Sequence, residues 1–331
     1  MITVATSSRF AAWSAVCAAF FAPLLLQVAR LPNGDFGAQF HSFALFQAGE
    51  MAAGRLPLWS PGSYGGFPFA ADTQSAVFYL PRWITVLLSL PRGLSCYALE
   101  LEAIAHVWLA GMFTYFLAHD LTRDRWAGLP GADRAFGLGG YTGAPIPSSN
   151  WLFWKQSRLP LVLLLLRRAF RPGARRGVWL MAAAVVLGLS LLAGHPQTFL
   201  QMSYLAAATL PASWRGKARW RWPWALVWAY SSRIAIGVSA VAWLPAVRYA
   251  AETTRTATDY AFVASGFPLL DYLQALVPDV LTAWSPQYVG LAAVFFAVLA
   301  WMNRRAAGSR AAPSCCLLDD CGPDHRLVVI G

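Results

Sequence analysis

The sequence predicts an all-α integral membrane protein, and three observations carry this expectation. Of its 331 residues, 57% are hydrophobic and only 12% are charged, whereas soluble proteins carry about 25% charged residues. The apolar residues gather in runs of roughly 20, the length that crosses a bilayer as a helix. Short arginine-rich segments separate these runs, as in the cytoplasmic loops of membrane proteins. This composition excludes a soluble enzyme, a disordered chain and a small disulfide-stapled domain.

About eight apolar segments are expected to cross the membrane. Their approximate bounds are 10–29, 97–118, 127–147, 151–166, 177–193, 198–212, 223–245 and 287–302. A further run, 76–90, is interrupted by Pro81 and is too short to cross, so we expect it to lie along the interface. The basic loops then all fall on one side, which the positive-inside rule assigns to the cytoplasm. These loops are 120–134, 167–176, 214–222 and 303–310.

The first segment is expected to remain in the protein, with the N-terminus in the cytoplasm and the chain in the cell inner (cytoplasmic) membrane. The run 10–29 is longer than the apolar core of a signal peptide, which has about 7–15 residues. It is followed by Leu31-Pro-Asn-Gly, which is no small-residue cleavage site. We therefore interpret it as an uncleaved first span.

One membrane domain is expected over residues 1–305. Its outer loops would be 30–96, 145–158 and 248–286. Residues 306–331 are polar, rich in cysteine and without periodicity, so we expect an irregular tail typical of a truncated or frame-shifted reading frame. The tail contains no CxxC pair, and we predict no metal site there.

The cytoplasmic loops offer no site for a nucleotide or a nucleic acid. The chain contains no GxxxxGK[ST] motif and no GxGxxG after a strand. Of its 26 basic residues 24 are arginines in short clusters, without the continuous basic face that nucleic acid requires. Any chemistry is therefore expected at the outer boundary of the membrane, with membrane lipids as partners.

Asp35 is the main candidate for catalysis, because it follows the first span by a few residues and so lies at headgroup depth. A carboxylate there suits a general base acting on a hydroxyl, or a ligand for a hard divalent cation. Alternatively, Asp35 caps a helix over residues 36–53. The residue type and its place leave these interpretations open.

Two other groups of polar residues are expected on the outer side. His195 and Gln197 lie in the tight turn Gly194-His-Pro-Gln, where His195 can bond a sugar hydroxyl, relay a proton, bind a metal or cap a helix end. Arg248, Glu252 and Arg255 are spaced to share one helical face, where arginine forks bind phosphate. The alternatives for this second group are a solvated helix with an exposed ion pair, or arginines that snorkel to lipid headgroups.

Three further charges lie within or beside apolar runs. Glu100 and Glu102 stand at the outer start of the second span, so we expect them to stay hydrated. Arg233 lies within the run 223–245, where ionisable residues are usually functional or paired, but the sequence names no partner for it.

Seven short motifs follow one another along the chain and resemble those of the YfhO-like bacterial membrane proteins. That family looks like the GT-C superfamily of membrane glycosyltransferases. The resemblance covers residues 10–302, and its motifs are Asp35-Phe-Gly-Ala-Gln-Phe, Gly54-Arg-Leu-Pro-Leu-Trp-Ser, Gly65-Gly-Phe-Pro, Ala135-Phe-Gly-Leu-Gly-Gly-Tyr, Gly194-His-Pro-Gln, Trp243-Leu-Pro-Ala and Trp284-Ser-Pro-Gln-Tyr-Val-Gly.

The resemblance implies transfer of a sugar from a polyprenyl-phosphate-linked donor to an extracytoplasmic acceptor. It implies an acidic residue of the first outer loop at the reacting centre, and Asp35 is the matching position. The expected substrate-binding residues are His195, Gln197, Arg248, Glu252 and Arg255. A divalent cation is the one candidate cofactor. The sugar, the acceptor and the oligomeric state stay open.

Two alternatives remain beside the enzyme. A transporter or flippase for a lipid-linked substrate predicts a polar path and an internal repeat, and the sequence has neither. The other alternative is an inactive fragment, because YfhO-like proteins continue with further spans and an outer domain. The resemblance therefore also implies a C-terminal truncation.

Overall fold

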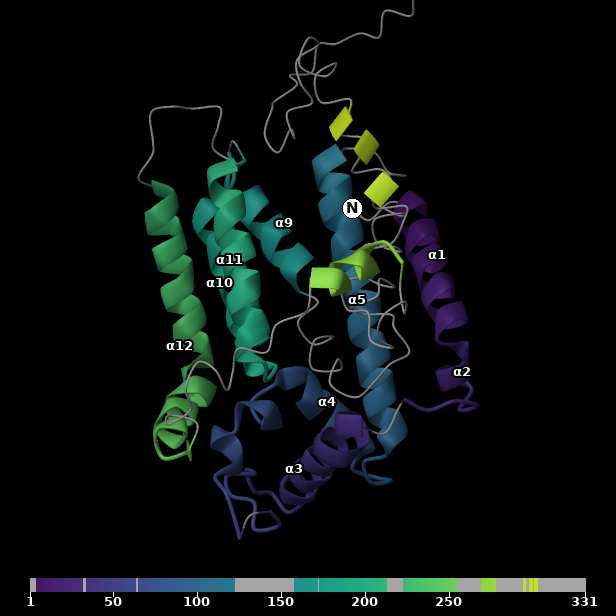
Figure 1. Cartoon of the computed structure of the whole chain (residues 1–331), viewed down its shortest axis with the longest axis vertical. Helices are drawn as coiled ribbons and strands as arrows, with labels where there is room; N and C mark the ends of the chain where they lie inside the picture. The colour runs from purple at the N-terminus through teal and green to yellow at the C-terminus, as the bar shows by residue number, and fades with distance from the viewer. Residues whose placement is uncertain are drawn as a thin grey trace, which may run out of the picture.

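A computed structural model gives the fold of the chain (Figure 1). It describes residues 4–31, 34–63, 65–122, 158–171, 173–212, 223–254 and 269–277, with three pairs of residues between 294 and 302. These residues form helices and no strand, apart from a single antiparallel bridge between Ser60 and Phe67. The all-α prediction is thus confirmed for the described part of the chain.

Nine α-helices are described, together with shorter π- and 3₁₀-helical turns. The first part of the chain holds α1 (Val4–Phe20), α2 (Ala22–Leu25), the π-helix η1 (Phe36–His41), α3 (Ser42–Ala52), η2 (Phe69–Ala71), η3 (Thr73–Ser75), α4 (Leu80–Ser89) and α5 (Cys96–Thr122). The second part holds α9 (Leu159–Ala169), α10 (Arg176–Leu192), α11 (Pro196–Ala212), α12 (Pro223–Ala251) and η6 (Leu269–Ala275).

The long helices form a bundle whose two ends differ. In it α5 contacts α1 and α9, and α10 contacts α9, α11 and α12. Figure 1 shows α3 and α4 at the lower end, where α5 begins, and we name this the Cys96 end. The opposite end, where α5 finishes, is named the Thr122 end. There Arg167, in the last turn of α9, and Arg171, just after α9, contact Asp120 of α5.

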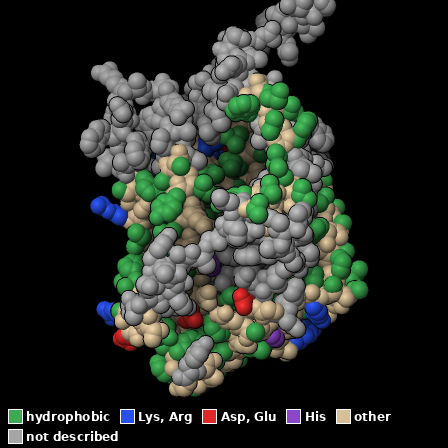
Figure 2. All heavy atoms as spheres, in the orientation of Figure 1, with side chains coloured by type: hydrophobic (Ala, Val, Ile, Leu, Met, Phe, Trp, Pro, Cys, Tyr) green, Lys and Arg blue, Asp and Glu red, His purple; other side chains and the backbone are tan. Residues whose placement is uncertain are grey.

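Two described helices are long and apolar enough to cross a membrane, by length and composition. They are α5, Cys96–Thr122, and the part of α12 from Trp228 to Ala251. Only 11% of the most apolar stretch of α12 is buried inside the protein, so its hydrophobic side chains face outward. Figure 2 shows hydrophobic side chains over both flanks of the molecule. These features indicate a membrane protein.

Other expected spans are shorter than predicted or lie outside the described residues. In place of the run 151–166, α9 begins at Leu159 and has 11 residues, which extend only about 16 Å. The physical reason is Pro160, which occupies the first turn of α9, where proline is tolerated. The run 127–147 and most of 287–302 lie outside the described residues. The eight crossings therefore stay a prediction.

The short run at 76–90 contains an amphipathic helix, α4, with its apolar side outward. Arg82 and Val86 are buried, whereas a stripe of large hydrophobic residues is exposed. The stripe consists of Leu80, Ile84, Leu87 and Leu88. In water such exposure is unfavourable, while at a lipid boundary it is the favoured orientation.

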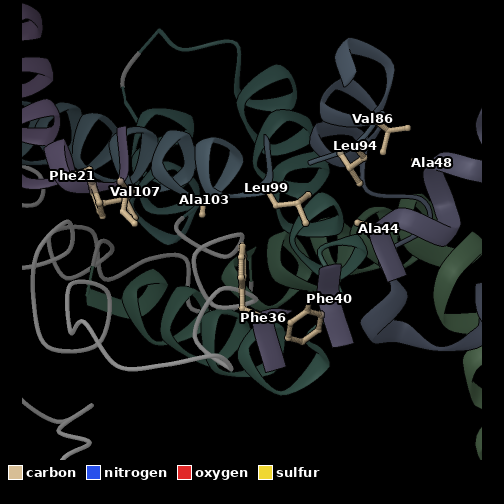
Figure 3. Close-up of a cluster of buried hydrophobic side chains, with 11 residues drawn as sticks. Phe21, Phe36, Phe40, Ala44, Ala48, Val86, Leu94, Leu99, Ala103 and Val107 are labelled. Carbon is tan, nitrogen blue, oxygen red and sulfur yellow. The ribbon is translucent and has the colours of Figure 1, made fainter. Parts of the chain in front are cut away.

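The core nearest the candidate site joins η1 to α5 (Figure 3). Phe36 and Phe40, one helical turn apart, pack in one buried cluster with residues that recur every four positions on α5: Leu99, Ala103 and Val107. Burying each phenylalanine contributes about 1.5–3 kcal/mol. The helix expected over 36–53 is thus present, as η1 followed by α3, and it is fixed against α5.

Candidate functional site

Asp35 stands immediately before η1, with its side chain exposed. It occupies the N-cap position, but its backbone is α-helical (φ −62°, ψ −27°) and its side chain makes no capping hydrogen bond. The neighbouring Phe36, only 2% exposed, fixes this point of the chain against α5. The capping interpretation of Asp35 therefore finds no hydrogen bond in the described structure.

A glutamine pair links the Asp35 helix to the next part of the first outer segment. Gln39, one helical turn after Asp35, donates from Nε2 to Oε1 of Gln74 at 2.7 Å. The backbone N–H of Gln74 in turn donates to Oδ1 of Asp72 at 2.9 Å, so Asp72 caps η3. The carboxylate of Asp72 is therefore structural, in contrast to that of Asp35.

The turn Gly194-His-Pro-Gln packs against this same segment. A Cβ on Gly194 would lie 2.7 Å from the carbonyl oxygen of Thr73, and Gly194 has a φ of +97°. Only glycine adopts this conformation at such close approach without strain. Since η3 contacts both η1 and this turn, two of the sequence motifs lie at one end of the bundle.

His195 caps helix α11, which begins at Pro196. Its Nδ1 accepts hydrogen bonds from the backbone N–H of Thr198 at 3.2 Å and from the Thr198 hydroxyl at 2.8 Å. Burial lowers the pKa of His195 and so favours the neutral ring that can accept. A capping role is thus observed for His195, at the start of the following helix. Gln197 is exposed beside it.

The group around Arg248 is less clearly defined. Arg248 and Glu252 are exposed at the end of α12, and the described residues include no ion pair between them. Arg255 lies outside the described residues. Helix α12 does contact η2 and η3, with Ala242 packed against a cluster that contains Ala76 and Tyr79. It therefore reaches the Cys96 end, although among the described residues no hydrogen bond or ion pair joins Arg248 or Glu252 to Asp35.

Beneath these segments lies a buried polar cluster that the sequence analysis did not predict, which we name the Glu102 cluster. Its members are Tyr79, Arg82, Glu102, His106 and Arg158. Nε of Arg82 lies 2.8 Å from Oε2 of Glu102, and their side chains are only 2% and 3% exposed. The two opposite charges compensate each other where neither reaches solvent.

Tyr79 connects the remaining members of the cluster. It accepts from Arg158 and donates to Nε2 of His106, while Nδ1 of His106 donates to the Glu102 carbonyl oxygen at 2.6 Å. Burial raises the pKa of Tyr79 to about 12, against the opposing effect of Arg158. Tyr79 therefore keeps its proton and orders the ring of His106.

The expectation that Glu100 and Glu102 are hydrated is wrong. Glu100 is fully buried, accepts from the backbone N–H of Leu31 at 2.9 Å and pairs with Arg30 at 3.2 Å. The first outer segment folds over the start of α5 and removes both carboxylates from water. The sequence contained an indication of this, since charges in apolar runs are usually paired, and Arg82 lies in such a run.

No cluster of metal ligands supports the candidate divalent cation. The described residues contain no group of three His, Cys, Asp or Glu side chains that could hold a metal ion. Asp35 is thus not part of a three-residue ligand group among these residues. We therefore derive no step through a metal.

Comparisons of the chain with protein-family models, with curated proteins and with solved structures found no match. The geometry of the Cys96 end and the chemistry of its residues are accordingly the basis for assigning a function.

Proposed function

We propose that this protein is a YfhO-like membrane glycosyltransferase of the GT-C type, in the cell inner membrane, with about eight crossings and a cytoplasmic N-terminus. It transfers a sugar from a polyprenyl-phosphate donor to an extracytoplasmic acceptor. One observation supports this most directly: the Asp35 carboxylate is exposed, and its side chain has no hydrogen bond or ion pair in the described structure. An accessible carboxylate on a backbone fixed by packing is what a general base requires.

The proposed reaction is a single displacement at the anomeric carbon. An acceptor hydroxyl oxygen attacks this carbon and gives its proton to Asp35, while the bond from the carbon to the phosphate oxygen breaks. The bonding pair leaves with the lipid phosphate, and the sugar is transferred with inversion. The hydrophobic anchors Phe36 and Phe40 keep Asp35 in place during this step.

The surroundings of Asp35 support a lipid-linked donor. The exposed apolar stripe of α4 suits an interfacial position, which is the depth at which a polyprenyl phosphate presents its sugar. We assign the binding of phosphate to Arg248 and Arg255, because arginine matches its oxygens in pairs. Gln197 and Glu252 would bind sugar hydroxyls, and His195 would hold the turn that carries Gln197.

The test is transfer of a labelled sugar from polyprenyl-phosphate donors in membranes that contain the full chain. We expect Asp35→Asn to reduce the rate at least about 100-fold, the usual contribution of a general base. Glu50→Gln is the matched control, because Glu50 is another carboxylate of the same outer segment and pairs with exposed Arg55. Unchanged transfer by Asp35→Asn, at equal membrane insertion, would contradict the proposal.

A transporter for a lipid-linked substrate is the second candidate function. The observation that favours it is the Glu102 cluster, since buried ionisable groups in membrane proteins often mark a substrate path. The same membranes distinguish the two functions. Movement of the lipid-linked sugar between leaflets, without transfer to an acceptor, would replace the enzyme by the transporter.

A further inference from the structure

A second acid–arginine cluster lies at the Thr122 end of the bundle, away from the candidate site. Nε of Arg167 lies 2.6 Å from Oδ2 of Asp120, and Nη2 of Arg171 lies 2.6 Å from Oδ1. Arg168 approaches the same carboxylate at 3.7 Å. We name these four residues the Asp120 cluster. One carboxylate therefore faces three guanidinium groups.

Two more arginines, at the start of α10, add to the positive charge beside the Asp120 cluster. Arg175 and Arg176 are both exposed, and Nε of Arg176 donates to the carbonyl oxygen of Ala169 at 3.4 Å, which places it beside the cluster. The N-terminus of α10 has no side-chain cap at Arg175. Its helix dipole adds partial positive charge at this point.

The three arginines of the Asp120 cluster differ in their exposure and in how closely they contact Asp120. The Arg167 side chain is 8% exposed, whereas those of Arg168 and Arg171 are 35% and 32% exposed. Nε of Arg168 is buried and has no hydrogen-bond partner among the described residues, because its 3.7 Å distance to Asp120 is too long. Arg168 also lies over the ring of Trp179 at 5.4 Å, which holds the guanidinium in one orientation. The guanidinium of Arg168 is therefore held against Trp179, while about a third of the side chain stays exposed.

An apolar surface begins directly beside this basic site. On α10, Val178 and Met181 are exposed, although both are hydrophobic. They are one turn apart and follow Arg176 closely, so acyl chains lying against them would bring a headgroup to the arginines. A ligand that combines a phosphate with hydrocarbon chains matches both surfaces.

We propose that the Asp120 cluster binds the phosphate of an anionic phospholipid at the Thr122 end of the bundle. Arg168 and Arg171 donate to the phosphodiester oxygens, Arg167 stays with Asp120, and Arg175 and Arg176 add attraction at longer range. The bound lipid anchors α9 and α10 at the membrane boundary. This site is independent of the proposed sugar transfer.

The experiment measures lipid bound to the purified full chain in a neutral detergent. The probes are phosphatidylglycerol and, as a neutral lipid with the same chains, phosphatidylcholine. We expect the wild type to retain phosphatidylglycerol in preference to phosphatidylcholine. The double variant Arg168→Gln/Arg171→Gln should bind phosphatidylglycerol with an affinity at least about tenfold lower. The control Arg92→Gln removes an exposed arginine at the Cys96 end and should bind as the wild type.

A replacement variant and a second probe complete the experiment. If the double variant fails to fold, the single Arg168→Gln variant replaces it, since Arg168 has the weakest contact with Asp120. Inorganic phosphate is the second probe. If it raises the unfolding temperature as much as phosphatidylglycerol does, the site binds free phosphate and the lipid proposal is overturned. Equal binding of both lipids, or unchanged binding in the variants, would overturn it as well.

Discussion

Helix α5 carries buried carboxylates near both of its ends, and two of them, Glu102 and Asp120, are neutralised in different ways. At the Cys96 end, Glu102 pairs with Arg82, and both side chains are almost completely buried. At the Thr122 end, Asp120 faces three arginines, two of which are about one-third exposed. In the first arrangement one acid pairs with one arginine and neither reaches solvent. The second has a cationic excess open to its surroundings, so it can bind an anion.

The strongest test of this comparison is Glu102→Gln. The substitution leaves the Arg82 charge buried without its anion, and breaking a buried pair in this way costs about 3–5 kcal/mol. We expect a loss of that size in the free energy of unfolding, measured by denaturant titration of the protein in detergent. The double variant Arg82→Met/Glu102→Leu should recover much of the loss, because it removes both charges. If Glu102→Gln is as stable as the wild type, the Arg82 charge is not buried away from solvent as described.

A smaller loss is expected for Asp120→Asn. Two of the three arginines can turn toward water, and the principal loss is the charged hydrogen bond to buried Arg167, about 1.5–3 kcal/mol. The same titration measures it. Increasing salt should reduce the effect, since exposed charges are screened. If Asp120→Asn costs as much as Glu102→Gln at every salt concentration, the two clusters do not differ as described.

The smallest expected effect concerns the cap of α11 at the Cys96 end. His195→Ala removes the acceptor for the Thr198 N–H, a loss of about 1 kcal/mol. Because burial lowers the pKa of His195 in the folded protein, the unfolded chain binds its proton more readily. The stabilisation is therefore present above about pH 6.5, the unperturbed pKa of histidine, and is lost as the pH falls through the lower pKa of the folded state.

Thermal unfolding between pH 5 and 8 tests this dependence. The wild type should lose stability on acidification relative to His195→Asn, because asparagine caps helices without titrating. Parallel curves for the two proteins would show that His195 does not act as a neutral cap.

Much of the fold follows from composition and periodicity. Low charge and long apolar runs predicted a helical membrane protein. The structure confirms that the described residues are mainly helical, with two helices long and apolar enough to span. The helix after Asp35 and the short helix within 76–90 were also predictable, because local apolar spacing specifies them. Their packing against α5, in contrast, involves partners distant in the chain.

The candidate site was predictable only in part. The sequence singled out Asp35 and the Gly194 turn, but their connection depends on Gln39, Gln74 and Thr73, whose contacts no local pattern indicates. The roles of Arg248, Glu252 and Arg255 stay predictions. The buried state of Glu100 was mispredicted, because its hydration depends on a segment 70 residues away, at Arg30.

The sequence by itself determined the class of protein, the helical segments and the basic and polar stretches between them, because hydrophobicity and charge act residue by residue. Only the tertiary structure decided which charges are neutralised. Glu102 and Asp120 are both acidic residues in one apolar helix, and nothing local distinguishes them. Their partners come from α4 in one case and from α9 and its following turn in the other. The number of arginines that meet each carboxylate, and their exposure, follow from how those helices pack against α5.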